Sequence, residues 1–300
     1  MNFADRLTEA VLQKENPSVI GLDPDLGRFP SEYAAAHDPA ASRAEKAAAM
    51  VAYLTEVIEI VAPHVPAVKP QSAFFEVLGA DGAQAWETIV ERARAAGLLV
   101  IGDAKRGDIG STASAYATGL LEGSCEADRA HVCDALTVNP YLGSDAMQPF
   151  LDACAKVDAG LFVLVRTSNP SSSEFQLQGE PPLMERVARA VDQWGANLVG
   201  NSGLSSVGAV VGATHPEVFV EMRALMPKTL FLLPGYGAQG GTASGLAPAF
   251  TEGLRGAIVN SSRGILYAYQ KSDAKDWRDA TRAATLAMKD DLCQGILSRT

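Results

Sequence analysis

The chain has 300 residues, of which 47% are hydrophobic and 20% charged, and its formal net charge at pH 7 is -10. This composition predicts a folded globular protein with a large core and argues against disorder. The acidic balance argues against a nucleic-acid partner, because proteins that bind nucleic acids are usually basic. It still permits an anionic ligand that is held by a few local cations.

Cysteine and histidine usage indicates neither disulfides nor a metal site. The four cysteines are scattered and form no C-x-x-C pair, which is typical of reduced thiols in the cytoplasm (Cys125, Cys133, Cys154 and Cys293). No two of the four histidines are spaced as a metal-binding pair. The segment 1–6 lacks the apolar region of a signal peptide, and no apolar run is long enough to cross a membrane. We therefore expect a cytoplasmic protein.

Taken in order, the chain alternates amphipathic and short apolar segments. An amphipathic helix is predicted over 3–15, before Pro17, and Ser42 to Glu45 forms a capping box that opens a long helix to about 62. Short buried strands are predicted at 19–23, 65–69, 97–103, 135–139, 161–165, 207–211, 229–233 and 256–260. The other helices are predicted at 82–96, 112–123, 145–157, 182–195, 216–226, 242–254 and 273–291.

This alternation predicts a parallel sheet with helical crossovers. Eight strand–helix repeats without a linker favour one (β/α)₈ barrel domain over 1–300, and an open doubly wound sheet is the alternative. Two polar loop inserts interrupt the pattern, near 28–41 and 166–182. A long loop inside a compact domain is often functional.

The segment 97–112 is the most informative stretch of the chain. An apolar run ends at Asp103, Lys105 follows two residues later, and Asp108 lies three residues after Lys105. Positions i and i+2 of an extended strand lie on one side, so we expect the first two charges to pair. Ser111 or Thr112 is the expected cap of the following helix. A catalytic pair is the favoured interpretation, and a buried structural ion pair is the alternative.

Further polar residues follow the other strands. The strand-end positions are Asp23, Lys69, Asp103, Lys105, Ser168, Gln239 and Arg263. In a barrel these strand ends meet at one mouth, where active sites are built. The glycine-rich segment 235–241 and the segment 261–264 follow the last two strands, at the usual phosphate position of this fold. The sequence therefore predicts a charged site for a phosphorylated ligand.

These motifs resemble the orotidine 5'-phosphate decarboxylase family, in the form of its longer bacterial branch. The segment 103–109, Asp-Ala-Lys-Arg-Gly-Asp-Ile, is similar to the family signature D-x-K-x-x-D-I. Similar family motifs surround Asp23, Lys69, Ser168 and the run 234–241. The motif Ser262-Arg263-Gly264 resembles the family motif whose arginine binds the phosphate group. The resemblance implies decarboxylation of orotidine 5'-monophosphate to uridine 5'-monophosphate in pyrimidine biosynthesis, without a cofactor.

The resemblance also implies residue roles. Lys105 would stabilise and protonate the C6 carbanion, next to Asp103, Lys69 and Asp108 as catalytic residues. Asp108 would reach the neighbouring subunit of a homodimer, together with Ile109 and Thr112. The expected substrate-binding residues are Asp23 for ribose, Ser168 for the base, and Gln239 and Arg263 for phosphate, with Ile109, Thr112, Pro234 and Gly264 beside them.

Two alternatives from other classes remain. A Mg²⁺-dependent sugar-phosphate aldolase or decarboxylase of a related barrel shares the D-x-K-x-x-D pattern, but it would prefer an acid at the position of Lys69. A non-enzymatic nucleotide-binding barrel would have no need of an alternating lysine–aspartate array.

Overall fold

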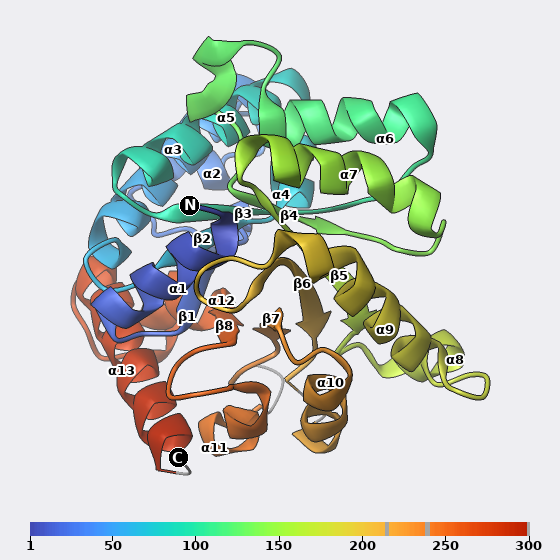
Figure 1. The fold of residues 1–300 in the computed structure, drawn as a ribbon. Helices are drawn as coiled ribbons and strands as arrows, with labels where there is room; N and C mark the ends of the chain where they lie inside the picture. Colours follow the sequence, from blue (N-terminus) through green and yellow to red (C-terminus); the bar gives the residue numbers. More distant parts are fainter. Residues whose placement is uncertain (214–215, 238–240, 299–300) are drawn as a thin grey trace.

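The computed structural model describes residues 1–213, 216–237 and 241–298. Within them, eight parallel strands close into a barrel in sequence order, as the sequence pattern predicted (Figure 1). The strands are β1 (Ser18–Leu22), β2 (Ala67–Pro70), β3 (Leu99–Arg106), β4 (Ala135–Val138), β5 (Gly160–Arg166), β6 (Ser205–Val211), β7 (Thr229–Pro234) and β8 (Ala257–Ser261). The barrel closes where β1 pairs with β8, with Ser18 opposite Val259.

Helices surround the barrel (Figure 1). They are α1 (Phe3–Lys14), α2 (Ala34–His37), α3 (Arg43–Val61), α4 (Ser72–Glu76), α5 (Gly79–Ala95), α6 (Gly110–Ala117), α7 (Ser144–Val157), α8 (Ser173–Gln176), α9 (Leu183–Gly195), α10 (Phe219–Leu225), α11 (Ala243–Leu246), α12 (Arg263–Leu266) and α13 (Trp277–Leu297). The predicted capping box at Ser42 and Glu45 is present at α3. No helix of the described residues is both long and apolar enough to cross a membrane.

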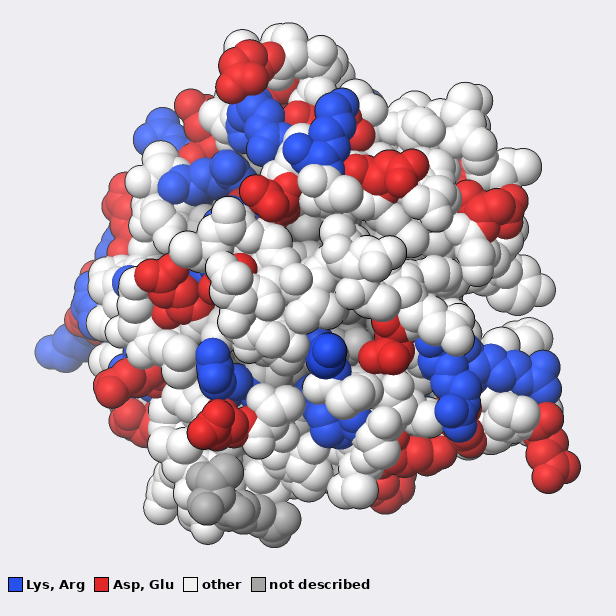
Figure 2. All heavy atoms as spheres, in the orientation of Figure 1, with Lys and Arg blue, Asp and Glu red and all other residues white. Residues whose placement is uncertain are grey.

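Helix α1 covers the end of the barrel where the strands begin. The Phe3 ring packs edge-on against Phe162 of β5, and Arg6 forms an ion pair with the buried Asp134 just before β4. Acidic and basic side chains are interspersed over the face drawn in Figure 2. The opposite end of the barrel, where the strands finish, is left for the site.

Three predicted helix boundaries are wrong. Neither Ser111 nor Thr112 caps α6, because β3 extends to Arg106 and the helix already begins at Gly110. The helix predicted over 242–254 stops after α11, since Pro248 lacks the N–H that a longer helix needs. The last helix starts at Trp277, where Asp276 is the N-cap.

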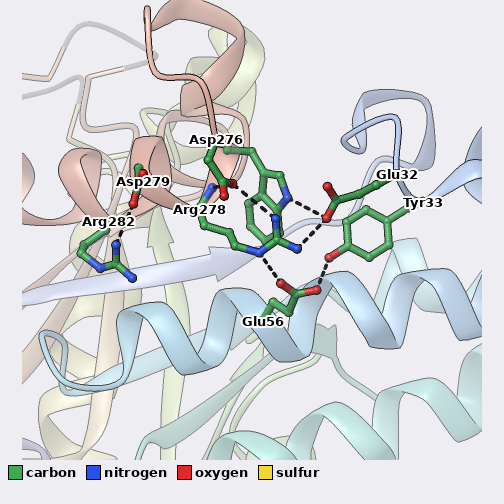
Figure 3. A network of polar contacts seen from close by, with 8 residues as sticks. Glu32, Tyr33, Glu56, Asp276, Arg278, Asp279 and Arg282 are labelled. Carbon is green, nitrogen blue, oxygen red and sulfur yellow. Dashed lines mark hydrogen bonds and ion pairs between the residues drawn. The ribbon is translucent and has the colours of Figure 1, made fainter.

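The insert near 28–41 is ordered by α2 and by contacts with α3 and α13. Arg278 at the start of α13 pairs with Glu32 of the insert and with Glu56 of α3, which also accepts a hydrogen bond from the Tyr33 hydroxyl (Figure 3). The Tyr33 ring packs against Tyr53 of α3. The insert therefore joins two helices on the outside of the barrel, and the second insert likewise contains a short helix, α8.

Candidate active site

Two lysines enclose one buried carboxylate at the carboxyl ends of β2 and β3. Lys69 forms an ion pair with Oδ2 of Asp103, and Lys105 Nζ lies 2.5 Å from Oδ1 of the same residue. The side chains of Lys69 and Asp103 are 5% and 9% exposed, whereas that of Lys105 is 47% exposed. Of the two ammonium groups, that of Lys105 is the one accessible to a ligand.

Lys105 reaches Asp103 in a different way from the one predicted. Its backbone is left-handed, with φ of 48°, so the extended i, i+2 geometry expected from the sequence is wrong. The pairing of β3 with β4 shifts register between Gly102 and Arg106, across this residue. A non-glycine residue in this conformation carries about 1–2 kcal/mol of strain. Such strain concentrates at functional sites.

Thr137 and Gln71 hold the carboxylate of Asp103 in place, and sequence reasoning missed both. The Thr137 hydroxyl on β4 donates to Oδ1 at 3.0 Å and accepts from the backbone N–H of Lys105 at 3.0 Å. Gln71 Nε2, just after β2, donates to Oδ2 at 3.0 Å. Thr137 is the polar residue of an otherwise apolar strand, which is the signal that could have identified it.

The charges of this cluster support one another. Burial alone would raise the pKa of Asp103, but the attraction and hydrogen bonds of Lys69 and Lys105 outweigh burial and hold it well below its usual range. Burial would likewise lower the pKa of Lys69, but Asp103 and Asp23 outweigh burial and raise it. Asp103 is therefore ionised, and Lys69 protonated, at neutral pH.

Asp23 follows β1 and offers a buried acceptor. Its Oδ1 atom is inaccessible to water and has no hydrogen-bond partner among the described residues. A buried oxygen without a partner is costly, and a ligand hydroxyl would satisfy it. Its position next to β2 places it near Lys69, whose pKa it helps to raise.

The remaining predicted binding residues follow β5, β7 and β8. Ser168 packs against Gly212 after β6, where a Cβ atom would lie 2.9 Å from the Ser168 nitrogen. Pro234 ends β7 and pairs with β8. Arg263 and Gly264 line a cleft of about 820 Å³. Gln239 lies outside the described residues.

The segment after β3, which contains Asp108, Ile109 and Thr112, forms no hydrogen bond or ion pair with the lysine–aspartate cluster within the described residues. Asp108 Oδ1 accepts from the backbone of Ile109, and neither residue is bonded to the Lys69–Asp103–Lys105 cluster in the described chain. The Ile109 side chain is 56% exposed, and Thr112 is exposed as well. One chain thus brings together three of the four predicted catalytic residues.

Comparisons with known proteins decide the family. The profile of the orotidine 5'-phosphate decarboxylase / HUMPS family matches residues 33–276. An orotidine 5'-phosphate decarboxylase of Rhodopirellula baltica is 43% identical over 97% of this chain and 99% of its own length. A second one, from Deinococcus radiodurans, is also 43% identical, over 97% of this chain and 96% of its own. The chain belongs to the orotidine 5'-phosphate decarboxylase family.

Solved structures of the family agree with the fold of this member. The structure of Leishmania donovani OMP decarboxylase superposes with a TM-score of 0.76 at 31% identity, covering 99% of this chain and 100% of that one. The family indicated by the motifs and the predicted barrel are both confirmed. In this decarboxylase family member, no group of three or more histidine, cysteine or acidic side chains is gathered for a metal within the described residues.

Proposed function

We propose that this chain converts orotidine 5'-monophosphate to uridine 5'-monophosphate and CO₂, with Lys105 as the central catalytic residue. The observation that carries the proposal is the position of the Lys105 ammonium. The ammonium is paired with Asp103 at 2.5 Å, and the Lys105 side chain as a whole is 47% exposed at the end of the barrel where the strands finish. A fixed, accessible cation of this kind suits a reaction in which negative charge develops on a substrate.

The reaction breaks the bond between C6 of the pyrimidine and its carboxylate. CO₂ leaves, and the electron pair stays on C6, in the plane of the ring, where the π-system cannot delocalise it. The Lys105 ammonium stabilises this charge and then donates a proton to C6, which yields uridine 5'-monophosphate. A solvent proton restores the ammonium, so each turnover consumes one proton.

Asp103 and Lys69 support this step. The ionised Asp103 would face the substrate carboxylate, and the repulsion between the two falls as CO₂ departs, which favours the transition state. Lys69 neutralises Asp103 from the buried side and keeps it ionised in a dry environment. Asp103 in turn orients the Lys105 ammonium.

The other residues would hold the nucleotide away from the reacting carbon. Asp23 offers its unpartnered oxygen to ribose, and Ser168 offers its hydroxyl to the base. Arg263 and Gln239 would hold the phosphate, beside Pro234 and Gly264. Binding energy from the phosphate can be used to orient the reacting end of the molecule.

We also propose a homodimer with shared sites. Large apolar side chains are exposed on the segments that follow β2, β3 and β4, namely Val77, Ile109, Tyr116, Tyr141 and Leu142. Exposed apolar side chains that gather on neighbouring segments mark an interface when they form one continuous patch. A partner subunit seated there would receive Asp108, Ile109 and Thr112 at its own site.

The donor set disfavours a magnesium-dependent reaction at this position. Magnesium binds through one or more carboxylates, and here the carboxylate of Asp103 already lies between two ammonium groups. A divalent cation would be repelled by both lysines. We further propose that residues 1–300 act as one domain and that the protein is cytoplasmic, which its four unpaired cysteines support.

The test follows the absorbance of orotidine 5'-monophosphate after addition of protein in buffer with excess EDTA. We expect the absorbance to fall and uridine 5'-monophosphate to accumulate in equal amount with released CO₂. Loss of turnover in EDTA that magnesium restores would favour the aldolase-like alternative. Absence of turnover with and without magnesium would refute the proposed activity.

A further inference from the structure

The cleft that contains Arg263 carries more positive charge than one phosphate ester needs. Three cationic side chains line it: Arg28 after β1, Arg263 of α12, and Lys271 between α12 and α13. No carboxylate is among its described lining residues. The chain as a whole has a net charge of -10. A local excess of three cations in an acidic protein indicates a site for a multiply charged anion.

Two of these cations have no side-chain partner among the residues that the structure describes. The side chains of Arg263 and Lys271 form no hydrogen bond or ion pair with any described residue, and both are exposed to solvent. Most of the other cations discussed above, including Lys69, Lys105 and Arg278, are paired with carboxylates. Side chains left without a partner in a concave site are available to a ligand.

Arg28 is held in position for the same purpose. Its guanidinium lies 4.2 Å from the centre of the Tyr267 ring, and Gln270 Oε1 accepts from its Nη2 at 2.6 Å. The Tyr269 hydroxyl donates to its backbone oxygen at 2.7 Å. These contacts fix the side chain and leave other N–H groups of the guanidinium without a partner in the described chain. A preorganised guanidinium binds phosphate oxygens at low entropic cost.

The cleft is also large enough for a longer anion. Its volume of about 820 Å³ lies within the range of about 300–1,000 Å³ that is usual for small-molecule sites. Hydroxyl groups of Ser261 and Ser272 line it, and small residues of α13, from Ala280 to Ala287, form one wall. Arg263 and Gly264 line it, whereas Lys69 and Lys105 do not, so the cleft adjoins the expected phosphate position and not the lysine–aspartate cluster.

We propose that this cleft binds the second and third phosphate groups of pyrimidine nucleoside 5'-di- and triphosphates. This inference rests on the proposed function, because it takes Arg263 as the contact of the first phosphate. Arg28 and Lys271 then bind the phosphates beyond it. Uridine 5'-diphosphate occupies the active site more tightly than the monophosphate product and competes with the substrate.

The test compares the binding of uridine 5'-monophosphate and 5'-diphosphate by calorimetry, in EDTA so that the diphosphate carries no metal. We expect the diphosphate to bind about tenfold more tightly, because it gains charge-assisted hydrogen bonds. This ratio should fall as salt concentration rises, since screening weakens exposed charges. A diphosphate that binds no more tightly than the monophosphate overturns the inference.

Matched variants locate the effect. Lys271→Ala should remove most of the preference for the diphosphate and leave monophosphate affinity and kcat/KM for orotidine 5'-monophosphate unchanged. Lys275→Ala is the control, because Lys275 is exposed in the same segment but does not line the cleft. Arg263→Ala should weaken the binding of both the monophosphate and the diphosphate. Equal effects of the Lys271 and Lys275 variants would refute the assignment.

The two proposals fail in different ways. Failure of the proposed function appears as no turnover of orotidine 5'-monophosphate by the unaltered protein. Failure of the present inference appears as normal turnover together with a diphosphate that binds no better than the monophosphate. Because the calorimetric ratio is measured without turnover, each result is read independently of the other.

Discussion

Lys105 Nζ lies 2.5 Å from Oδ1 of Asp103, and the carboxylate of this pair is buried while the lysine side chain is half exposed. The pair is thus anchored from behind, where Lys69, Thr137 and Gln71 all contact Asp103. The side of the pair that faces solvent is formed by the Lys105 side chain. A cation held in this way needs little reorganisation when charge develops on a ligand.

Replacing Lys105 by alanine should nearly abolish decarboxylation. The variant loses both electrostatic stabilisation and the proton donor, so kcat/KM should fall by about 10³-fold or more. Folding should be retained, because the side chain is half exposed. The control is Lys228→Ala, an exposed lysine just before β7 at the other end of the barrel. Turnover that survives in the Lys105 variant would contradict its assigned role.

Asp103→Asn should destabilise the protein as well as inactivate it. Removing the negative charge leaves Lys69 buried without its partner, which costs about 3–5 kcal/mol. Asp134→Asn is a matched control, since Asp134 is also buried and pairs with two arginines, but at the opposite end of the barrel. Chemical denaturation should show a loss of stability in both variants. Turnover per folded molecule should collapse only in the Asp103 variant.

The contribution of Asp103 to stability should depend on pH. Its pKa is lowered in the folded state, so the stabilisation is present above the ordinary value of 3.8 and is lost as pH falls through the lower folded value. The difference in unfolding free energy between the unaltered protein and Asp103→Asn should therefore be constant from about pH 5 to 8 and shrink in acid. Denaturant titrations at several pH values measure it, and a difference that grows in acid would contradict this sign.

Shared sites can be detected by mixing inactive variants. Asp108→Ala and Lys105→Ala would impair different parts of each site if Asp108 acts in the partner subunit. After subunit exchange, half of the dimers would be mixed, and each would contain one intact site, which restores about one quarter of full activity. A mixture of Lys69→Met and Lys105→Ala is the negative control. One chain supplies both lysines to a site, so every site of a mixed dimer lacks one of them and stays inactive. Equal activity in both mixtures would exclude sharing through Asp108.

Arg278 should contribute measurably to thermal stability. Figure 3 shows its guanidinium among Glu32, Glu56 and Asp276, and it also stacks on Trp277. Because a network is worth more than an isolated surface pair, Arg278→Ala should lower stability by about 1 kcal/mol, or Tm by a few degrees. Arg282→Ala is the control, since Arg282 lies one turn after Arg278 on α13 and forms a single ion pair among the described residues, with Asp279. In high salt the difference between the variants should narrow.

The barrel was predictable because its strands are continuous apolar runs and its helices carry clear start signals. The capping box at Ser42 and the strand-end charges at Lys69 and Asp103 are local patterns, and the structure preserves them. The predicted helix boundaries were wrong where a neighbouring residue or strand, and not the local pattern, determines where the helix begins or ends. Pro248 shortened one helix, and the extension of β3 moved the start of α6.

The site was predictable in its charges and less so in its geometry. Asp103 and Lys105 pair as expected, but through a left-handed backbone that no local pattern indicates for a lysine. Thr137 and Gln71 were missed because their roles arise only when β2, β3 and β4 lie side by side. The cleft cations Arg28 and Lys271 lie near opposite ends of the sequence and meet only in the folded chain. A sequence motif covers a short segment, so no motif could have predicted that they line one cleft.

Because Lys105 has a left-handed backbone, selection for stability and selection for turnover favour different residues at this position. Glycine adopts this φ without strain, so a library of variants sorted only for heat resistance would enrich Lys105→Gly. The same library sorted for turnover would retain lysine. Efforts to make this enzyme more robust should therefore hold position 105 fixed and search the outer helices instead.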